Sequence, residues 1–178
     1  MTSTLRQPVQ TETELRPGRW LALAVLVLAV LLVAVDATVL GLATPHISED
    51  LHPSGTQLLW IGDVYSFVIA GLLVSMGSLG DRVGRKRILL CGAAAFGAIS
   101  VLNAYATTPG LMILARALLG VAGATLMPAT LALIRNLFHD PRERSLAIGI
   151  WGATASAGTA VGPIVGGFLL EHFWWGSV

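Results

Sequence analysis

Three ionisable side chains lie within apolar runs that are long enough to cross a membrane. Arg116 is the only basic residue inside any such run, and Asp36 and Asp63 occupy two other runs in the same way. A charge at bilayer depth costs at least ~2.5–3.5 kcal/mol on insertion scales, so such residues are usually retained for function. Three of them in one chain indicate a transporter rather than a passive membrane anchor.

Asp36 and Arg116 together have the chemistry of a proton carrier. Removing a carboxyl group from water favours its neutral form, whereas a nearby guanidinium favours the carboxylate. A carboxyl group balanced in this way can load a proton in one conformation and release it in another. Simpler roles remain open: Asp36 caps a broken helix and Arg116 only pairs with it, while Asp63 is a helix-start residue near the membrane surface.

Five long apolar runs must position these side chains. Hydrophobic residues make up 54% of the chain and charged residues only 12%, whereas a soluble domain carries roughly 25% charged residues. About 20 helical residues cross the hydrocarbon core, and a barrel would instead show alternating segments of about ten residues. The sequence therefore predicts an all-α membrane protein with a mobile tail over 1–19 and a bundle over 20–178, whose helices cover about 20–43, 57–79, 88–107, 111–135 and 146–170.

The basic residues predict how this bundle is oriented. Every Lys and Arg except Arg116 falls before the first run, between the second and third, or from the end of the fourth onward, and 44–56 and 171–178 contain none. The positive-inside rule places these basic segments in the cytoplasm. We expect a multi-pass protein of the bacterial cytoplasmic membrane with a cytoplasmic amino terminus, and Trp174 and Trp175 in the outer interfacial belt.

Helix geometry predicts that the three buried charges share one layer. Counted from the predicted outer ends of their runs at about 1.5 Å per residue, all three lie about 8–10 Å deep. We expect them to face an interior cavity and to offset one another. Arg116 is expected to pair with Asp36, and Asp63 is then the more exposed acid, which attracts the cationic substrate.

A row of small residues marks the fifth run. Gly158, Gly162 and Gly166 recur at four-residue intervals, with Pro163 and Gly167 beside them. Small residues on one stripe let two helices approach closely, and a proline removes a backbone donor and can kink the helix. Helix packing alone remains the simpler explanation of this pattern.

The connection between the second and third runs, 77–87, combines glycines with several charges. Gly84 permits a tight turn, and the basic residues fix the topology. Asp81 adds nothing to the topology, so we expect it to partner an Arg or a helix amino terminus in another part of the molecule. A patch that only binds anionic lipid headgroups remains the alternative.

These motifs resemble those of the major facilitator superfamily. The segment 77–87 resembles its G-x-L-x-D-R-x-G-R-[KR] signature, and 116–124 is similar to its fourth-helix R-x-x-x-G-x-x-[GA] motif. The segment 158–167 is similar to the fifth-helix G-x-x-x-G-P-x-x-G-G motif, which marks antiporters within the superfamily. The motifs occur in the expected order and spans.

Two likenesses are narrower. The segment 36–39, followed by 43–45, resembles the first-helix D-x-T-[VI]…A-L-P motif of the fourteen-helix drug:proton antiporters, with Thr44 in place of the usual Leu. The segment 53–66 resembles the QacA-type quaternary-ammonium efflux pumps, in which the second-helix acid is present. The resemblance thus implies a multidrug efflux pump of the antiporter type.

The resemblance also implies roles for individual residues. Proton coupling falls on Asp36 and Arg116, and Asp63 is the candidate for attracting the substrate cation. The signature segment is expected to control the switch between inward- and outward-facing states. The expected gating residues are Gly77, Gly80, Asp81, Arg82, Gly84, Arg85 and Lys86, and the expected antiporter motif comprises Gly158, Gly162, Pro163, Gly166 and Gly167.

The implied activity is proton-coupled export of lipophilic cationic drugs, driven by the proton gradient without a cofactor. Its partners are lipophilic cations, protons and membrane lipid. The family needs two six-helix halves that rock about a central site, and five helices form most of the amino-terminal half. We therefore expect an amino-terminal fragment that lacks the carboxy-terminal half. The alternatives are a symporter or uniporter for another solute, or a non-transporting truncated membrane subunit.

Other function classes find no support in the sequence. It contains no Ser-His-Asp, zinc or phosphate-loop pattern, and its four histidines are scattered in connections and near the ends of the runs. We therefore expect no enzyme, no catalytic residue, no metal site and no nucleic-acid partner.

Overall fold

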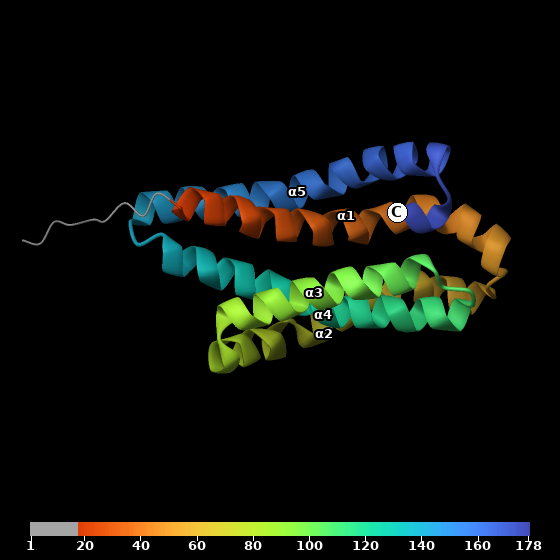
Figure 1. Cartoon of the computed structure of the whole chain (residues 1–178), viewed down its shortest axis with the longest axis horizontal. Coiled ribbons are helices and arrows are strands. Elements are labelled where there is room, and N and C mark those ends of the chain that lie inside the picture. The colour runs from red at the N-terminus through yellow and green to blue at the C-terminus, as the bar shows by residue number, and fades with distance from the viewer. Residues whose placement is uncertain (1–17) are drawn as a thin grey trace, which may run out of the picture.

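A computed structural model describes residues 18–178, which form a bundle of long helices (Figure 1). All of the regular structure in this range is helical, and five helices are long and apolar enough to cross a membrane, as the sequence predicts. The predicted tail lies almost wholly outside the described residues. The elements are α1 (Arg19–Leu51), α2 (Gly55–Val83), α3 (Arg85–Ala104), α4 (Pro109–Leu137), α5 (Pro141–His172) and the short 3-10 helix η1 (Trp175–Ser177).

Several helices extend beyond the apolar runs that predicted them. The prediction that 44–56 connects the first two helices is wrong for most of this segment, because α1 continues through Pro45 as far as Leu51. Hydrophobicity marks only the part of a helix that needs an apolar surrounding, so polar final turns escape it. Figure 1 shows these last turns of α1, drawn in orange, bending across the end of the bundle, where Pro45 breaks the regular hydrogen bonding.

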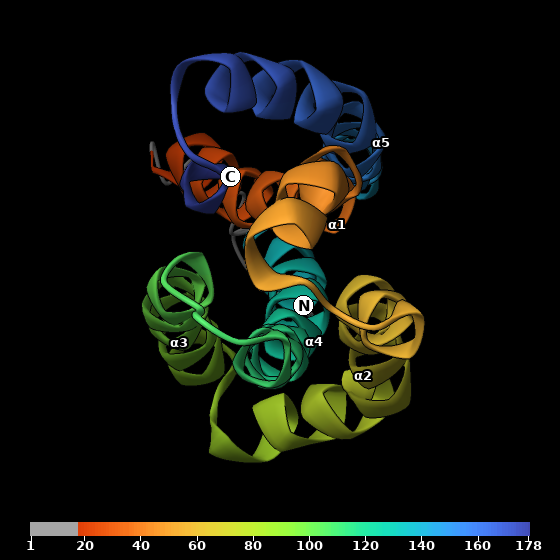
Figure 2. The same cartoon turned by 90° about the vertical axis from the view of Figure 1, so that its right-hand side faces the viewer.

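Viewed from the end, the helices form two groups (Figure 2). One group is α1 with α5, and the other is α4 flanked by α2 and α3. Contacts are extensive within each group, whereas α1 and α5 contact α4 much less. The arrangement therefore has a seam between the two groups, and α4 forms one wall of it.

Glycines set the close packing inside each group. A Cβ atom on Gly162 would collide with the Thr38 side chain of α1, and one on Gly120 would approach the carbonyl oxygen of Tyr65 in α2 to 2.8 Å. The predicted small-residue stripe of the fifth helix is thus a packing surface for α1. Gly167 is not part of it, because a Cβ there meets nothing within 4 Å.

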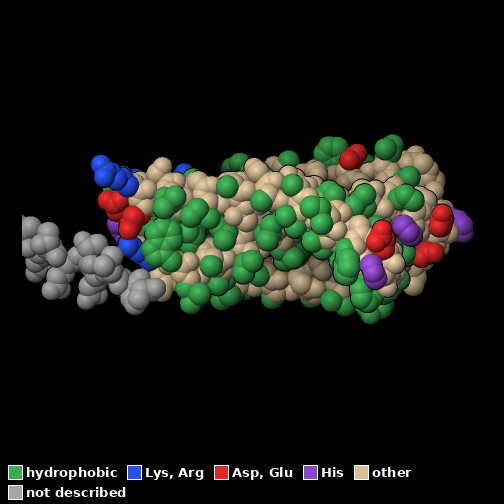
Figure 3. Space-filling model, turned by 90° about the horizontal axis from the view of Figure 1, so that it is seen from above, with side chains coloured by type: hydrophobic (Ala, Val, Ile, Leu, Met, Phe, Trp, Pro, Cys, Tyr) green, Lys and Arg blue, Asp and Glu red, His purple; other side chains and the backbone are tan. Residues whose placement is uncertain are grey.

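The two ends of the bundle differ in charge (Figure 3). One end, the basic end, holds the start of α1, the α2–α3 turn and the α4–α5 connection, and Lys and Arg side chains gather there. The other end, the acidic end, holds the α1–α2 and α3–α4 connections and residues 171–178, with Asp, Glu and His side chains. This separation agrees with the segregation of basic residues along the sequence.

Candidate functional site

An ion pair across the seam joins the two helix groups. Arg116 Nη1 on α4 donates a hydrogen bond of 3.0 Å to Asp36 Oδ2 on α1. The two side chains are only 2% and 15% exposed. The predicted partner of Arg116 is therefore confirmed as a contact. Because both charges are largely buried, loss of either partner would leave the other charge poorly compensated.

Tyr65 completes the surroundings of this ion pair, and sequence reasoning assigned it no role. Its ring lies 4.5 Å from the guanidinium carbon of Arg116, which is a cation–π arrangement. Its hydroxyl group donates a long hydrogen bond of 3.4 Å to the carbonyl oxygen of Val33 on α1. Tyr65 thus contacts both sides of the seam. Aromatic residues are common in apolar runs, so the sequence alone did not distinguish this one.

Asp63 does not join the ion pair, and the expectation that all three charges offset one another is wrong for this residue. Asp63 is exposed and forms no salt bridge within residues 18–178. Two positions along a helix correspond to about 200° of rotation, so Asp63 faces away when Tyr65 faces α4. Depth along the membrane could be counted from the sequence, but the direction of the side chain could not.

An open groove of about 530 Å³ lies next to the ion pair, between α1, α2, α4 and α5. Its lining is mainly small or apolar, with a few hydroxyl groups and no formal charge. Asp63 lies one helical turn from Ser66, toward the acidic end, on the same face of α2. The lining residues are Val33, Ala34, Ala37, Tyr65, Ser66, Ile69, Ala70, Met127, Ala155, Ser156 and Thr159.

The signature segment is mostly helical, contrary to the loop expected there. Helix α2 continues to Val83, and only Gly84 separates it from α3, with a φ of 108° that favours glycine. Asp81 accepts hydrogen bonds from Arg85, the Nε donor lying at 2.9 Å. Its partner is therefore four residues away, across the turn at Gly84, and not in another part of the described molecule.

Arg85 also connects this turn to the end of α4. Its Nη1 donates to the carbonyl oxygen of Ala132 at 3.2 Å and to Asn136 Oδ1 at 3.1 Å. A cation near the carboxy-terminal turns of a helix interacts favourably with the helix dipole. Arg82 and Lys86 are exposed and form no salt bridge among the described residues.

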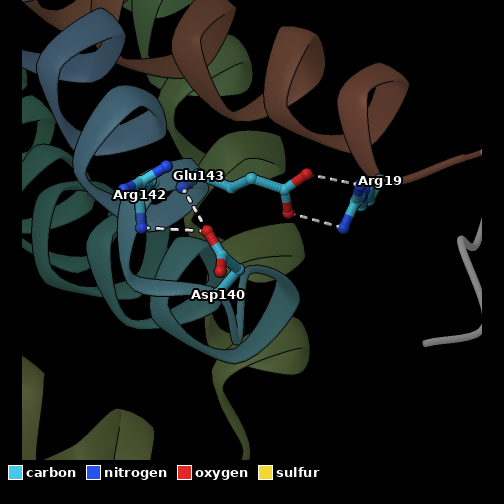
Figure 4. A network of polar contacts seen from close by, with 4 residues as sticks. All are labelled: Arg19, Asp140, Arg142 and Glu143. Atoms are coloured by element: carbon cyan, nitrogen blue, oxygen red, sulfur yellow. Dashed lines mark hydrogen bonds and ion pairs between the residues drawn. The ribbon is translucent and has the colours of Figure 1, made fainter. Parts of the chain in front are cut away.

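A second arginine cluster closes the basic end of the α1–α5 group (Figure 4). Arg19 at the start of α1 donates two hydrogen bonds of 2.7 Å to the carboxylate of Glu143 near the start of α5. Asp140 caps α5 by accepting from the backbone NH groups of Arg142 and Glu143. The Asp-Pro pair at the start of α5 could have indicated the cap, but nothing in the sequence indicated the partner of Arg19.

No group of three or more potential metal ligands occurs among residues 18–178. The features described above within residues 18–178 are ion pairs, hydroxyl groups and an apolar groove. Of the predicted residues, the structure joins Asp36 to Arg116 and Asp81 to Arg85, and leaves Asp63 apart.

Known proteins similar to this chain have names that refer to efflux or to resistance. "Multidrug efflux pump LfrA" of Mycolicibacterium smegmatis is 60% identical over 171 residues, which are 96% of this chain and 34% of that protein. "Methyl viologen resistance protein SmvA" of Salmonella typhimurium is 49% identical, over 90% of this chain and 32% of that protein. "Puromycin resistance protein pur8" of Streptomyces alboniger is 44% identical, over 89% of this chain and 32% of that protein.

The chain thus spans about a third of the length of the curated relatives it matches. Their names describe efflux and resistance, which agrees with the expectation that this is not an enzyme. The sequence model of the Major Facilitator Superfamily matches residues 26–178, which include all five long helices wholly or in part. Because that match covers most of the length of this chain, the chain belongs to the major facilitator superfamily.

Proposed function

We propose that this chain is part of a proton-coupled antiporter that exports lipophilic cationic compounds across the bacterial cytoplasmic membrane. The observation that carries the proposal is the buried ion pair of Asp36 and Arg116 across the seam. It lies beside an open groove that includes Tyr65. A proton acceptor, Asp36, and a space large enough for a substrate therefore lie side by side in the bundle.

Protonation of Asp36 supplies the coupling in this proposal. A neutral carboxyl group no longer offsets the charge of Arg116, which is almost fully buried on α4. An uncompensated buried charge is strongly destabilising, so α1 and α4 must rearrange around it. The sparse contacts between the two helix groups give the seam room to do so. Loading and release of one proton would thereby favour two different arrangements of the helices.

The groove supplies the substrate path. Its small and apolar lining suits a lipophilic body of variable shape, and it contains no fixed cation that would repel a positively charged compound. Asp63, exposed on α2 toward the acidic end, offers a negative charge near this path. The names of the relatives, which refer to multidrug efflux and methyl viologen resistance, support this class of substrate.

The orientation and the switch complete the proposal. The basic end is cytoplasmic by the positive-inside rule, which puts the amino terminus inside. The gating segment, in which Arg85 bonds both Asp81 and the last turns of α4, controls rocking against the carboxy-terminal half of the transporter. Arg82 and Lys86 are free to contact that half or lipid. Membership of the fourteen-helix, QacA-type branch belongs to the same proposal.

Two other functions need separate consideration. A symporter or uniporter for a polar solute would need polar groups in the groove, and its lining offers only a few hydroxyl groups. A non-transporting subunit would need no buried ion pair, because the glycine contacts already hold α1 to α5 and α2 to α4. The buried pair therefore favours the antiporter.

A chimera tests the proposal. This chain replaces the matching third of the Mycolicibacterium smegmatis pump, and inverted membrane vesicles are assayed for ethidium uptake driven by an imposed pH gradient. The unsubstituted chimera should accumulate the dye, and Asp36→Asn should abolish accumulation at equal expression. Gly97→Ala, at a site on α3 with open space around it and no assigned role, serves as the control. Uphill accumulation by Asp36→Asn would remove Asp36 from the coupling mechanism.

A further inference from the structure

A second, smaller cavity borders the ion pair from its α3 side. It lies between α1, α3, α4 and η1, whereas the substrate groove lies between α1, α2, α4 and α5. We call it the α3-side cavity. It has a volume of about 40 Å³, and its lining includes Asp36, Arg116, Ser100, Asn103 and Trp175.

Two buried polar atoms at this cavity have no hydrogen-bond partner among residues 18–178. They are Arg116 Nε and Asn103 Oδ1, and both residues line the cavity. Arg116 is 2% exposed, so bulk water cannot satisfy its Nε donor. Buried polar groups are paired in the great majority of cases, either with protein or with ordered water. One is a donor and the other an acceptor, so a water molecule can serve both.

The cavity is large enough for that water. A site holds one water when it offers about 10–15 Å³ to the centre of a water-sized probe, and the α3-side cavity offers several times this volume. It also follows α1 from Asp36 to Ile47 toward the acidic end, a rise of about 16 Å at 1.5 Å per residue. Near this end the indole NH of Trp175 donates to the carboxylate of Asp50.

We propose that the α3-side cavity is a hydrated route by which protons reach Asp36 from the outer surface, and that Asn103 positions the water beside Arg116. The inference rests on the proposed proton coupling. A proton passed along this water ends on an Asp36 carboxylate oxygen, which becomes a neutral carboxyl group, while the water remains water. The drug, which uses the groove on the α2 and α5 side, never shares this path.

Few other charges face the route from the helices around it. The titratable groups at the ion pair are Asp36 on α1, Tyr65 on α2 and Arg116 on α4. Helix α3 contributes only the neutral residues Ser100, Asn103 and Ala104 to the cavity lining, and α5 contributes nothing to it. A polar neutral group such as Asn103 can orient water without holding the proton itself, which is what a route requires.

Separate measurement of two transport modes tests the role of Asn103. In the chimera, drug–drug exchange needs no net proton movement, whereas pH-driven drug uptake does. Asn103→Leu, which has the same branching as Asn but no amide, should leave exchange unchanged and slow pH-driven uptake about tenfold or more. Asn103→Ser, which keeps a polar group, should restore most of it. Normal pH-driven uptake by Asn103→Leu overturns the proposal, and so does equal loss of both modes, which would make Asn103 structural.

The hydration itself has a test that does not depend on proton coupling. Ser100 lines the cavity, and its neighbour Val101 is exposed at the same depth on a different face of α3. In a Cys91→Ala background, Ser100→Cys should react with the small thiol reagent methanethiosulfonate ethylammonium, and Val101→Cys should not, because thiolates form in water and not in lipid. Failure of Ser100→Cys to react, or equal reaction at both positions, shows that the cavity is not a selective water path.

These two tests separate the inference from the proposed function. A wild-type chimera that exchanges drugs but shows no pH-driven uptake contradicts the antiporter, whatever the variants of Asn103 do. Reaction of Ser100→Cys in that chimera would then identify a water-filled cavity that carries no protons, which contradicts the route. If the wild-type chimera shows normal pH-driven uptake and Asn103→Leu loses only that uptake, both the antiporter and the proton route are supported.

Discussion

The α1–α5 group and the α2–α3–α4 group are held together internally in one way and joined to each other in another. Within each group, glycines bring helix backbones close, as Gly162 does against Thr38 and Gly120 against Tyr65. Between the groups, the contacts are fewer and include the ion pair of Asp36 and Arg116. Close glycine packing is hard to adjust, whereas an ion pair responds to a single proton. The contacts that a proton can change therefore lie at the seam between the groups and not within them.

Another polar contact crosses the same seam nearer the basic end. Trp151 Nε1 on α5 donates to Thr130 Oγ1 on α4 at 3.1 Å. It is a neutral hydrogen bond, so protonation does not change it. The seam thus combines an ion pair that a proton alters with neutral hydrogen bonds that it leaves intact. We expect the region around Asp36 to move more than the region around Trp151.

Removal of Arg116 should have the largest effect. Arg116→Leu leaves the Asp36 carboxylate without its partner, and losing one member of a buried pair costs about 3–5 kcal/mol. We expect the chimera to lose thermal stability in detergent and all pH-driven uptake. The double variant Arg116→Leu with Asp36→Leu should regain stability but not uptake. A double variant as unstable as the single one would show that the ion pair is not the source of the loss.

Disturbing the packing inside the α1–α5 group should have a smaller effect. Gly162→Val places its side chain against Thr38, and overpacking of this kind costs about 1–3 kcal/mol. Gly167→Val, in the same helix, meets open space and should be neutral. The melting temperatures of the two variants in detergent compare these sites directly. Equal destabilisation would show that the glycines act through helix propensity rather than through contact with α1.

The ion pair at the basic end should matter less than the one at the seam. Arg19 and Glu143 are 13% and 31% exposed, so water partly replaces a lost partner. Arg19→Gln should destabilise the bundle by up to about 1 kcal/mol, with a smaller effect at high salt. Thermal melting at low and high ionic strength measures the loss of stability and its dependence on salt. A loss as large as that of Arg116→Leu would remove the distinction between exposed and buried pairs.

Asp63→Asn should have the smallest effect on stability, because Asp63 has no ion-pair partner in the described residues and faces outward. We expect unchanged melting but altered selectivity, with weaker export of divalent than of monovalent organic cations. Efflux of methyl viologen and ethidium by the same cells compares the two. Equal loss of both substrates would make Asp63 part of the coupling machinery instead.

The sequence predicted most of the fold for physical reasons that are visible in single residues. Apolar length gave the number of long helices, and the basic residues gave the two ends of the bundle. Two helical segments were not predicted: the polar turns of α1 after Pro45, and the last turns of α2 around Asp81. Both lie outside the apolar layer, where hydrophobicity does not indicate a helix. Trp175 was expected in the interfacial belt, but it is buried against its neighbours and bonded to Asp50.

The candidate site was only partly predictable. Depth arithmetic placed Asp36 and Arg116 at one level, and their opposite charges indicated the contact that the structure shows. The direction of Asp63 depends on how α2 is rotated against α4, which the packing of Gly120 against Tyr65 and Val68 determines. Asn103 and the α3-side cavity depend on three helices and η1 at once, so no local pattern could have revealed them.

Proton release on drug binding tests most directly whether Asp36 carries the coupled proton. The solubilised chimera is held in a weakly buffered solution near neutral pH, and ethidium is added while the pH is recorded. We expect proton release from the unsubstituted chimera and from Asp63→Asn, and none from Asp36→Asn at equal drug binding. Undiminished release from Asp36→Asn would contradict the mechanism, because the proton would then come from another group.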